Sequence, residues 1–189
     1  FERHPLHRHI HMLAADFLFA LPLISDLAKA AGHTVATPAE AQRLLHEGKL
    51  VGVWPEGVAG VGKTWNRRYQ LQPFSKGGYI KAAKQAEVPL IPLAIVGAEE
   101  AYPMIGDIEP LAKLLRVPYF PVTPLFPWLG PLGAIPLPSK WIIEFGKPIL
   151  PSQLPAADDH AAVLIASEAF RQRVQDMVRH LLDVRGAAF

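Results

Sequence analysis

The chain has 189 residues, enough for one domain with a sizeable core, and half of them are apolar while 19% are charged. The net charge is only +2, and no basic stripe carries interleaved aromatic residues, so the sequence argues against a nucleic-acid partner. The absence of cysteine excludes disulfides, thiolate metal sites and a cysteine nucleophile.

The first part of the chain alternates short strands and helices. Periodicity predicts strands at 8–14, 34–36 and 50–54, and helices at 17–21, 23–31, 38–47 and 78–86. Asp16 can cap the first of these helices. Thr37-Pro38-Ala39-Glu40 is typical of a helix start, because the hydroxyl caps an orphan amide and proline suits the first position. We expect a loop from Trp54 to about Gln72.

The second part predicts strands at 90–96 and 141–145, and helices at 108–115 and 161–184. The terminal helix carries one apolar stripe, which we expect to face the rest of the domain. A helix on a membrane surface is the alternative. Helices alternate with strands that read as apolar on both faces. This pattern favours an α/β class with a largely parallel sheet covered by helices, in a single domain over residues 1–189.

The segment 117–138 has no charged residue and seven prolines. It cannot form a helix, since each interior proline costs about 3 kcal/mol. Two interpretations stay open. The segment is either a proline-stiffened connection packed on the core or an apolar surface against lipid or acyl chains. No uncharged run is both long enough and proline-free enough to span a bilayer, so we expect no transmembrane helix in this chain.

Residues 57–64 read GVAGVGKT and match the phosphate-loop pattern G-x-x-x-x-G-K-[ST]. Pro55-Glu56 directly before it places a carboxylate where anionic phosphates would lie. Residues 65–73 lack a clear apolar face for the helix that should follow. The strands at 90–96 and 141–145 also do not end in the aspartate that would hold magnesium. Nucleotide binding is therefore a weak third hypothesis.

Three stretches occur in an order that resembles the glycerolipid acyltransferase family, of the 1-acylglycerol-3-phosphate acyltransferase type. They are Val53-Trp54-Pro55-Glu56-Gly57, then Phe74-Ser75-Lys76-Gly77-Gly78, then Val88-Pro89-Leu90-Ile91-Pro92-Leu93-Ala94-Ile95-Val96-Gly97. The similarity covers residues 8–100, with weaker support near 141–148. It implies a glycerol-3-phosphate acyltransferase-like fold.

The resemblance implies acyl transfer from a thioester to a lipid hydroxyl, either of a lysophospholipid or of a neutral glyceride. Acyl-CoA or an acyl carrier protein would be the co-substrate, and no cofactor or metal is needed. The resemblance assigns Pro55, Glu56, Gly57 and Val58 to the acceptor site, and Lys63 is the nearby cation. It also implies a catalytic histidine, followed five residues later by an aspartate that orients it.

This sequence departs from the family pattern at two places. The H-x-x-x-x-D motif belongs upstream of the strand at 8–14, so we expect it outside this chain; His11 and Asp16 are the one formal match. Val58-Ala59-Gly60 stand where the family has a phosphate-pairing arginine, and Lys63, Arg67 or Arg68 are possible substitutes. The stretch from Gly78 to Glu100 is also similar to a branch that esterifies neutral alcohols such as diacylglycerol.

The remaining motifs give weaker evidence of function. His4, His7, His9 and His11 could share a strand face, but no carboxylate lies at a diagnostic metal-binding spacing. No G-x-S-x-G turn supports a serine hydrolase. We expect a membrane-associated acyltransferase on the cytoplasmic side, held at the surface as a peripheral protein. The rival hypothesis is a non-catalytic lipid-binding or interaction domain of the same fold.

Overall fold

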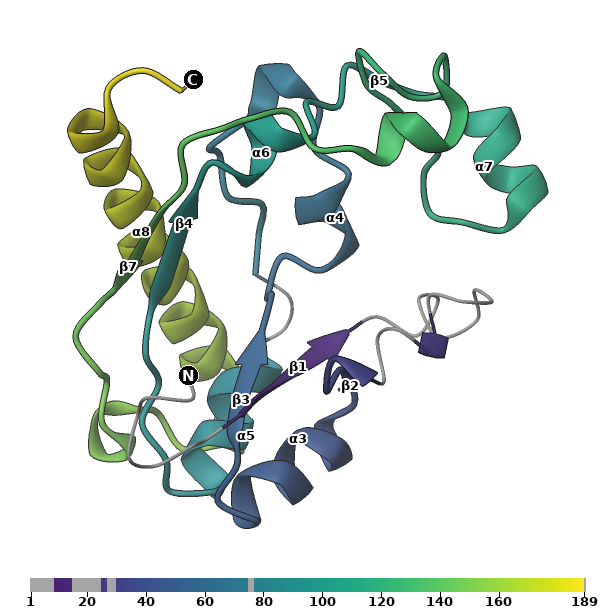
Figure 1. The fold of residues 1–189 in the computed structure, drawn as a ribbon. Helices are drawn as coiled ribbons and strands as arrows, with labels where there is room; N and C mark the ends of the chain where they lie inside the picture. Colours follow the sequence, from purple (N-terminus) through teal and green to yellow (C-terminus); the bar gives the residue numbers. More distant parts are fainter. Residues whose placement is uncertain (1–8, 15–24, 27–29, 75–76, 189) are drawn as a thin grey trace. The chain divides into compact units, whose positions relative to one another are not determined.

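A computed structural model describes residues 9–14, 25–26, 30–74 and 77–188 (Figure 1). By its internal contacts the chain divides into two compact units. Unit 1 comprises residues 1–57, 73–90 and 148–169, and unit 2 comprises residues 58–72, 91–147 and 170–189. The division concerns contacts and not independent folding, so the single domain over 1–189 stays a prediction.

Unit 1 largely follows the predicted order of elements. Its elements are β1 (Ile10–Ala14), β2 (Thr34–Val35), α3 (Pro38–His46), β3 (Leu50–Val53), α5 (Gly78–Gln85), η3 (Pro151–Gln153) and the first part of α8 (His160–Arg185). The predicted helix at 17–21 and its cap Asp16 lie outside the described residues. Within the predicted helix at 23–31, residues 25, 26 and 30 are described and are helical.

The sheet of unit 1 is parallel, with strand order β2-β1-β3. Met12 of β1 pairs with Gly52 of β3, where an added Cβ would collide with the Met12 sulfur. Helix α3 begins as its sequence predicts, since Thr37 Oγ1 accepts a hydrogen bond of 3.2 Å from the Glu40 amide. These elements confirm the α/β class with a parallel sheet.

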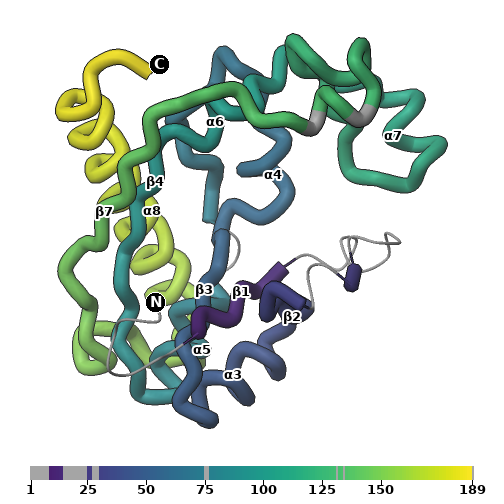
Figure 2. Tube along the Cα trace, in the orientation of Figure 1, coloured from purple at the N-terminus to yellow at the C-terminus, as the bar shows by residue number. Residues whose placement is uncertain are grey.

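The core of unit 1 lies between α5, α8 and the segment around η3. The buried side chains of Ile80, Ala83, Leu154 and Val163 form one cluster, and Tyr79 packs against it. Figure 2 shows α3 and α5 close together, and their side chains meet where Gln42 donates to Gln85. Helix α5 is therefore held from two sides.

Unit 2 contains more helix than the sequence predicts. Its elements are α4 (Val58–Val61), η1 (Trp65–Arg67), β4 (Leu93–Val96), α6 (Ala98–Ala101), β5 (Gly106–Asp107), α7 (Glu109–Leu115), β6 (Pro121–Val122), η2 (Gly130–Ala134), β7 (Ile142–Phe145) and the last part of α8. The predicted loop after Trp54 thus contains two short helical turns. Strand β4 begins at Leu93 and not at residue 90, because Pro92 has no N–H for a ladder.

Strands β4 and β7 pair antiparallel, with Leu93 opposite Phe145 and Ile95 opposite Ile143. One face of this pair is covered by α8, where Ala94 and Val96 form a buried cluster with Val174, Val178 and Leu181. The opposite face exposes Leu93, Ile143 and Phe145. The prediction of a buried strand at 90–96 is therefore only half right, because one of its faces is exposed. The strands β4 and β7 form a sheet of their own, and the parallel sheet is β2-β1-β3.

The uncharged segment 117–138 is partly packed and partly exposed, and its contact with lipid or acyl chains stays a prediction. Phe120 and Phe126 pack with ring centroids 5.3 Å apart, and Thr123 is buried, so part of the segment is a packed connection. Trp128, Leu129, Leu132 and Ile135 are exposed. Among the residues that the structure describes, no helix combines the length and the apolar character needed to cross a bilayer.

Candidate functional site

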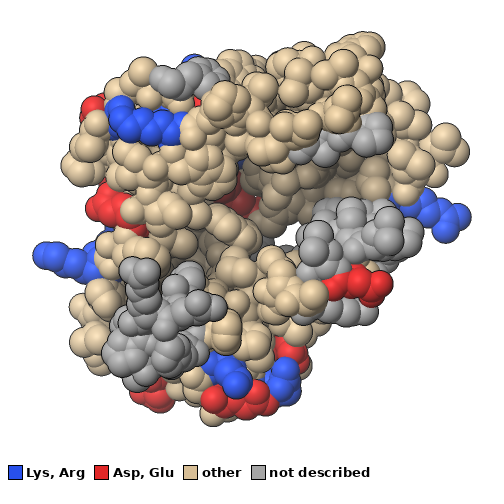
Figure 3. Space-filling view, viewed as in Figure 1, with Lys and Arg blue, Asp and Glu red and all other residues tan. Residues whose placement is uncertain are grey.

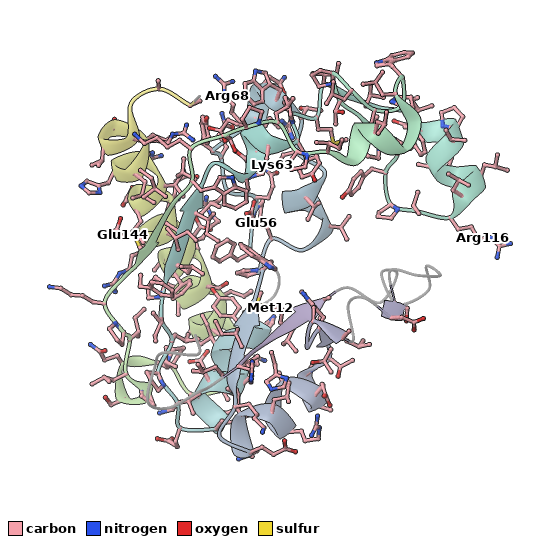
Figure 4. The ribbon with its side chains drawn as sticks, in the orientation of Figure 1. Met12, Glu56, Lys63, Arg68, Arg116 and Glu144 are labelled. Carbon is pink, nitrogen blue, oxygen red and sulfur yellow. The ribbon has the colours of Figure 1, made fainter. Side chains whose placement is uncertain are left out.

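The predicted acceptor residues form a tight turn at the end of β3. The Gly57 amide donates to the Trp54 carbonyl over 3.0 Å, and Gly57 has φ 57°, which favours glycine. Glu56 is half-buried in this turn, and Trp54 is exposed. Figure 4 labels Glu56 after β3 and Met12 on the neighbouring strand β1. The turn thus lies at the carboxyl end of parallel strands, where α/β sheets bind their ligands.

Of the formal pair His11 and Asp16, the structure describes only His11. His11 lies in β1, is half-buried, and pairs in register with Val51. Asp16 lies outside the described residues, so the structure gives no distance between the two side chains. The assignment of a catalytic pair to His11 and Asp16 stays a prediction.

The GVAGVGKT stretch does not have the local structure of a phosphate loop. Val58 begins the single turn α4, and Gly62 closes it by donating to the Val58 carbonyl over 2.9 Å. Only the three-residue turn η1 follows Thr64. A phosphate loop needs a full helix there, because the amides of its first turn point at the phosphates.

Lys63 is engaged inside unit 2. Its Nζ lies 2.8 Å from Glu99 Oε1 and donates to the Gln70 carbonyl over 3.1 Å. The side chain is only 8% exposed, so this ion pair is largely shielded from water. Of the other candidate cations, Arg68, which Figure 4 labels, stacks on Trp65 at 4.4 Å and donates to its carbonyl. Whether Lys63 contacts substrate stays a prediction.

Unit 2 also contains a charged cluster that the sequence does not predict, built on a buried ion pair. It consists of Tyr69, Glu100 and Arg185. Arg185 Nη2 lies 2.5 Å from Glu100 Oε1 and 2.9 Å from the Tyr69 hydroxyl, which itself donates to Glu100. The side chain of Glu100 is 0% exposed and that of Arg185 is 2% exposed. The only sequence signal is the Glu99-Glu100 pair after an apolar strand.

The contacts within this cluster change the pKa of Tyr69 and of Arg185. Burial, together with the hydrogen bond to Glu100, raises the pKa of the Tyr69 phenol. Burial disfavours the charged guanidinium of Arg185, but its hydrogen bonds to Glu100 and Tyr69 outweigh this and raise its pKa. The neutral Tyr69 hydroxyl is therefore hydrogen-bonded to both members of the Arg185–Glu100 ion pair.

Residues 69–71 are also fixed to α8. Gln175 accepts from the Leu71 amide and donates to the Tyr69 carbonyl, each over 2.8 Å. A depression of about 510 Å³ lies beside these contacts, lined by Tyr69, Gln70, Leu71, Arg171, Gln172, Gln175, Arg179 and Leu182. None of the predicted acceptor residues lines it.

Metal ligation finds no support in the described part of the chain. His4 and His7 lie outside that part, and His9 and His11 are within it. No group of three or more His, Cys, Asp or Glu side chains there could hold a metal ion.

The family model described as Acyltransferase matches residues 1–96, which include β1, β3 and the Glu56 turn. The chain therefore belongs to the acyltransferase family. This confirms the resemblance carried by the Pro55-Glu56-Gly57 turn and the stretches that follow it.

Several known proteins are similar to the chain. Uncharacterized proteins of Mycobacterium tuberculosis and Mycobacterium leprae are 45% identical over 190 residues, covering 100% of this chain. The chain spans about half their length, 53% and 52%. A Gallus gallus protein named DGAT1/2-independent enzyme synthesizing storage lipids is 25% identical over 142 residues, which are 75% of this chain and 40% of that protein.

One solved structure resembles the fold. It is the 1-acyl-sn-glycerophosphate (LPA) acyltransferase PlsC from Thermotoga maritima, with a TM-score of 0.56 and 16% sequence identity. The match covers 90% of this chain and 56% of that chain. The glycerol-3-phosphate acyltransferase-like α/β fold is thereby confirmed.

Proposed function

We propose that this chain is the acceptor-binding part of an enzyme that transfers a fatty acyl group from an acyl thioester to a lipid hydroxyl. The observation that carries the proposal is the Glu56 turn at the carboxyl end of the parallel strands, within the part that matches the acyltransferase family. Acyl-CoA or an acyl carrier protein is the proposed donor. The cytoplasmic side of a membrane remains the expected location.

The proposed chemistry needs a base and a well-held acceptor. A histidine takes the hydroxyl proton while the oxygen attacks the thioester carbonyl; an ester C–O bond forms, the C–S bond breaks, and the thiolate leaves as a thiol with a proton. No acyl-enzyme is required. Glu56 would hold the acceptor so that its hydroxyl faces the thioester, and such positioning is worth orders of magnitude in rate.

The acceptor is proposed to be a neutral glyceride in preference to a lysophospholipid. Residues 58–60 are valine, alanine and glycine and offer no cation to a phosphate. Lys63 is held by Glu99 and the Gln70 carbonyl. The similarity to a protein named for the synthesis of storage lipids supports the same choice.

The test compares the full-length protein with its Glu56→Ala and Glu56→Gln variants, using lysophosphatidate, monoacylglycerol and diacylglycerol as acceptors. We expect Glu56→Ala to lower kcat/KM by about 10²-fold, the usual cost of a misplaced substrate. Asp158→Ala is the matched control, because it removes an exposed carboxylate from the same unit.

The outcomes separate the proposals. Unchanged turnover in Glu56→Ala would remove Glu56 from the site. A preference for lysophosphatidate would overturn the choice of a neutral acceptor. Failure of the wild-type protein to acylate any of the three acceptors, with retained lipid binding, would favour the rival non-catalytic lipid-binding domain.

A further inference from the structure

Unit 2 carries an exposed apolar surface that the acyl-transfer chemistry does not use. It consists of exposed side chains at the end of α7 and in the segment around η2, two segments that the pairing of β5 with β6 holds in one part of unit 2. Its members are Leu114, Leu115, Trp128, Leu129, Leu132 and Ile135, and we call them the α7–η2 surface. Leu114 is 76% exposed and Trp128 is 72% exposed. Exposed apolar side chains that gather in one part of a surface are typical of an interaction site, whereas singly scattered ones are ordinary.

The two contributing segments belong to one part of unit 2. Strand β5, which leads into α7, pairs with β6 of the 117–138 segment. The Ile108 amide donates to the Phe120 carbonyl over 3.1 Å, and the Phe120 amide donates to Asp107 Oδ1 over 2.7 Å. Phe120 in turn packs on Phe126, two residues before Trp128. Figure 1 shows α7 and this segment together at the upper right.

Charge is arranged around this surface and not within it. Segment 117–138 has no charged residue, and the upper right of Figure 3 is correspondingly tan. Two cations stand beside the leucines: Lys113 precedes Leu114, and Arg116 caps α7, as Figure 4 labels. Both cations are exposed. Lys113 Nζ lies 3.7 Å from Glu109 Oε2, and such an exposed ion pair contributes little to the stability of the fold.

An apolar patch that contains an exposed tryptophan and has cations at one edge matches the interface of a bilayer. Tryptophan favours the headgroup level, leucine side chains enter the acyl region, and Lys or Arg meets anionic headgroups. A protein partner would instead be expected to offer polar groups for a mixed rim. The charge complementarity therefore points to anionic lipid.

We propose that the α7–η2 surface docks onto an anionic lipid bilayer, with Leu114 and Trp128 inserted and with Lys113 and Arg116 against the headgroups. The choice of a bilayer as the partner rests on the proposed function, whose acceptor is a lipid. Docking here would hold unit 2 at the surface where that acceptor resides.

The experiment measures sedimentation of the full-length protein with phosphatidylcholine vesicles and with vesicles that also contain phosphatidylglycerol. We expect Leu114→Ser and Trp128→Ser each to weaken vesicle binding about tenfold, since each removes a large inserted side chain. Arg116→Ser should weaken binding to the anionic vesicles about fivefold and leave neutral vesicles unaffected. Brominated lipid should quench emission in the wild type more than in Trp128→Phe.

The matched control is Ile165→Ser, which removes a 73% exposed apolar side chain from α8 in unit 1. It should bind vesicles like the wild type. Unchanged binding in Leu114→Ser and Trp128→Ser, or an equal loss in Ile165→Ser, would overturn the proposal. Binding is read without an acyl donor, and turnover on monomeric short-chain acceptors reports the proposed function alone, so the two can fail separately.

Discussion

Replacing Arg185 by methionine should destabilise the protein strongly. The change keeps much of the side-chain volume but leaves the fully buried Glu100 carboxylate with only the Tyr69 hydroxyl. Breaking a buried pair from one side costs about 3–5 kcal/mol. In the described part of the chain, Glu100 Oε2 and Arg185 Nε have no hydrogen-bond partner, so the pair is not fully satisfied. We therefore expect the lower end, about 3 kcal/mol, or ~6–12 °C in Tm.

Urea unfolding at neutral pH, followed by circular dichroism, measures this loss. Arg179→Met is the control, because it removes an exposed arginine of the same helix whose ion pair with Asp176 contributes at most about 1 kcal/mol. The double variant Glu100→Gln/Arg185→Met should be more stable than Arg185→Met, since it no longer buries an unpaired charge. The reasoning is refuted if Arg185→Met costs no more than Arg179→Met, or if the double variant regains nothing.

Three further predictions concern other positions. Gly77→Ala should lower the free energy of unfolding by about 2 kcal/mol or more, because Gly77 has φ 65° and an added Cβ meets an α8 side chain. Gly78→Ala is its control and should stay within about 1 kcal/mol of the wild type in urea unfolding. Lys63→Met should cost about 1–3 kcal/mol, because half-buried Glu99 loses its cation and, among the described residues, keeps only the Tyr69 amide as a donor. Calorimetric heat with Mg-ATP that disappears in this variant would instead support the phosphate loop. Burial raises the pKa of Tyr79 to about 12, so the folded state holds the phenol proton more tightly than the unfolded state. The stability of the wild type relative to Tyr79→Phe should therefore be fully present below pH 10 and lost between pH 10 and 12. Urea midpoints of the two proteins over this pH range measure the loss.

Where the deciding interactions are local, the elements could be predicted from the sequence. Helix α3 begins at Pro38 because its cap and first turn lie within four residues, and α8 runs over 160–185 because its apolar stripe repeats throughout. Strand β4 is shorter than its apolar run, since a ladder needs amides that proline lacks. Its antiparallel partner and its exposed face depend on β7, almost fifty residues later, and no local pattern encodes that pairing.

The same division holds for the candidate site. The family and the turn could be predicted from Trp54-Pro55-Glu56-Gly57 and the glycines that follow in order. A tight turn at a strand end needs glycine where φ is positive, as at Gly57, so the local sequence reflects the backbone. The partner of Lys63 in the folded chain could not be determined in this way, since one sequence pattern is compatible with a phosphate or with a carboxylate next to the ammonium. Only the tertiary structure decided for Glu99, because the fold of unit 2 brings α6 against this loop and the nearest opposite charge takes the buried ammonium.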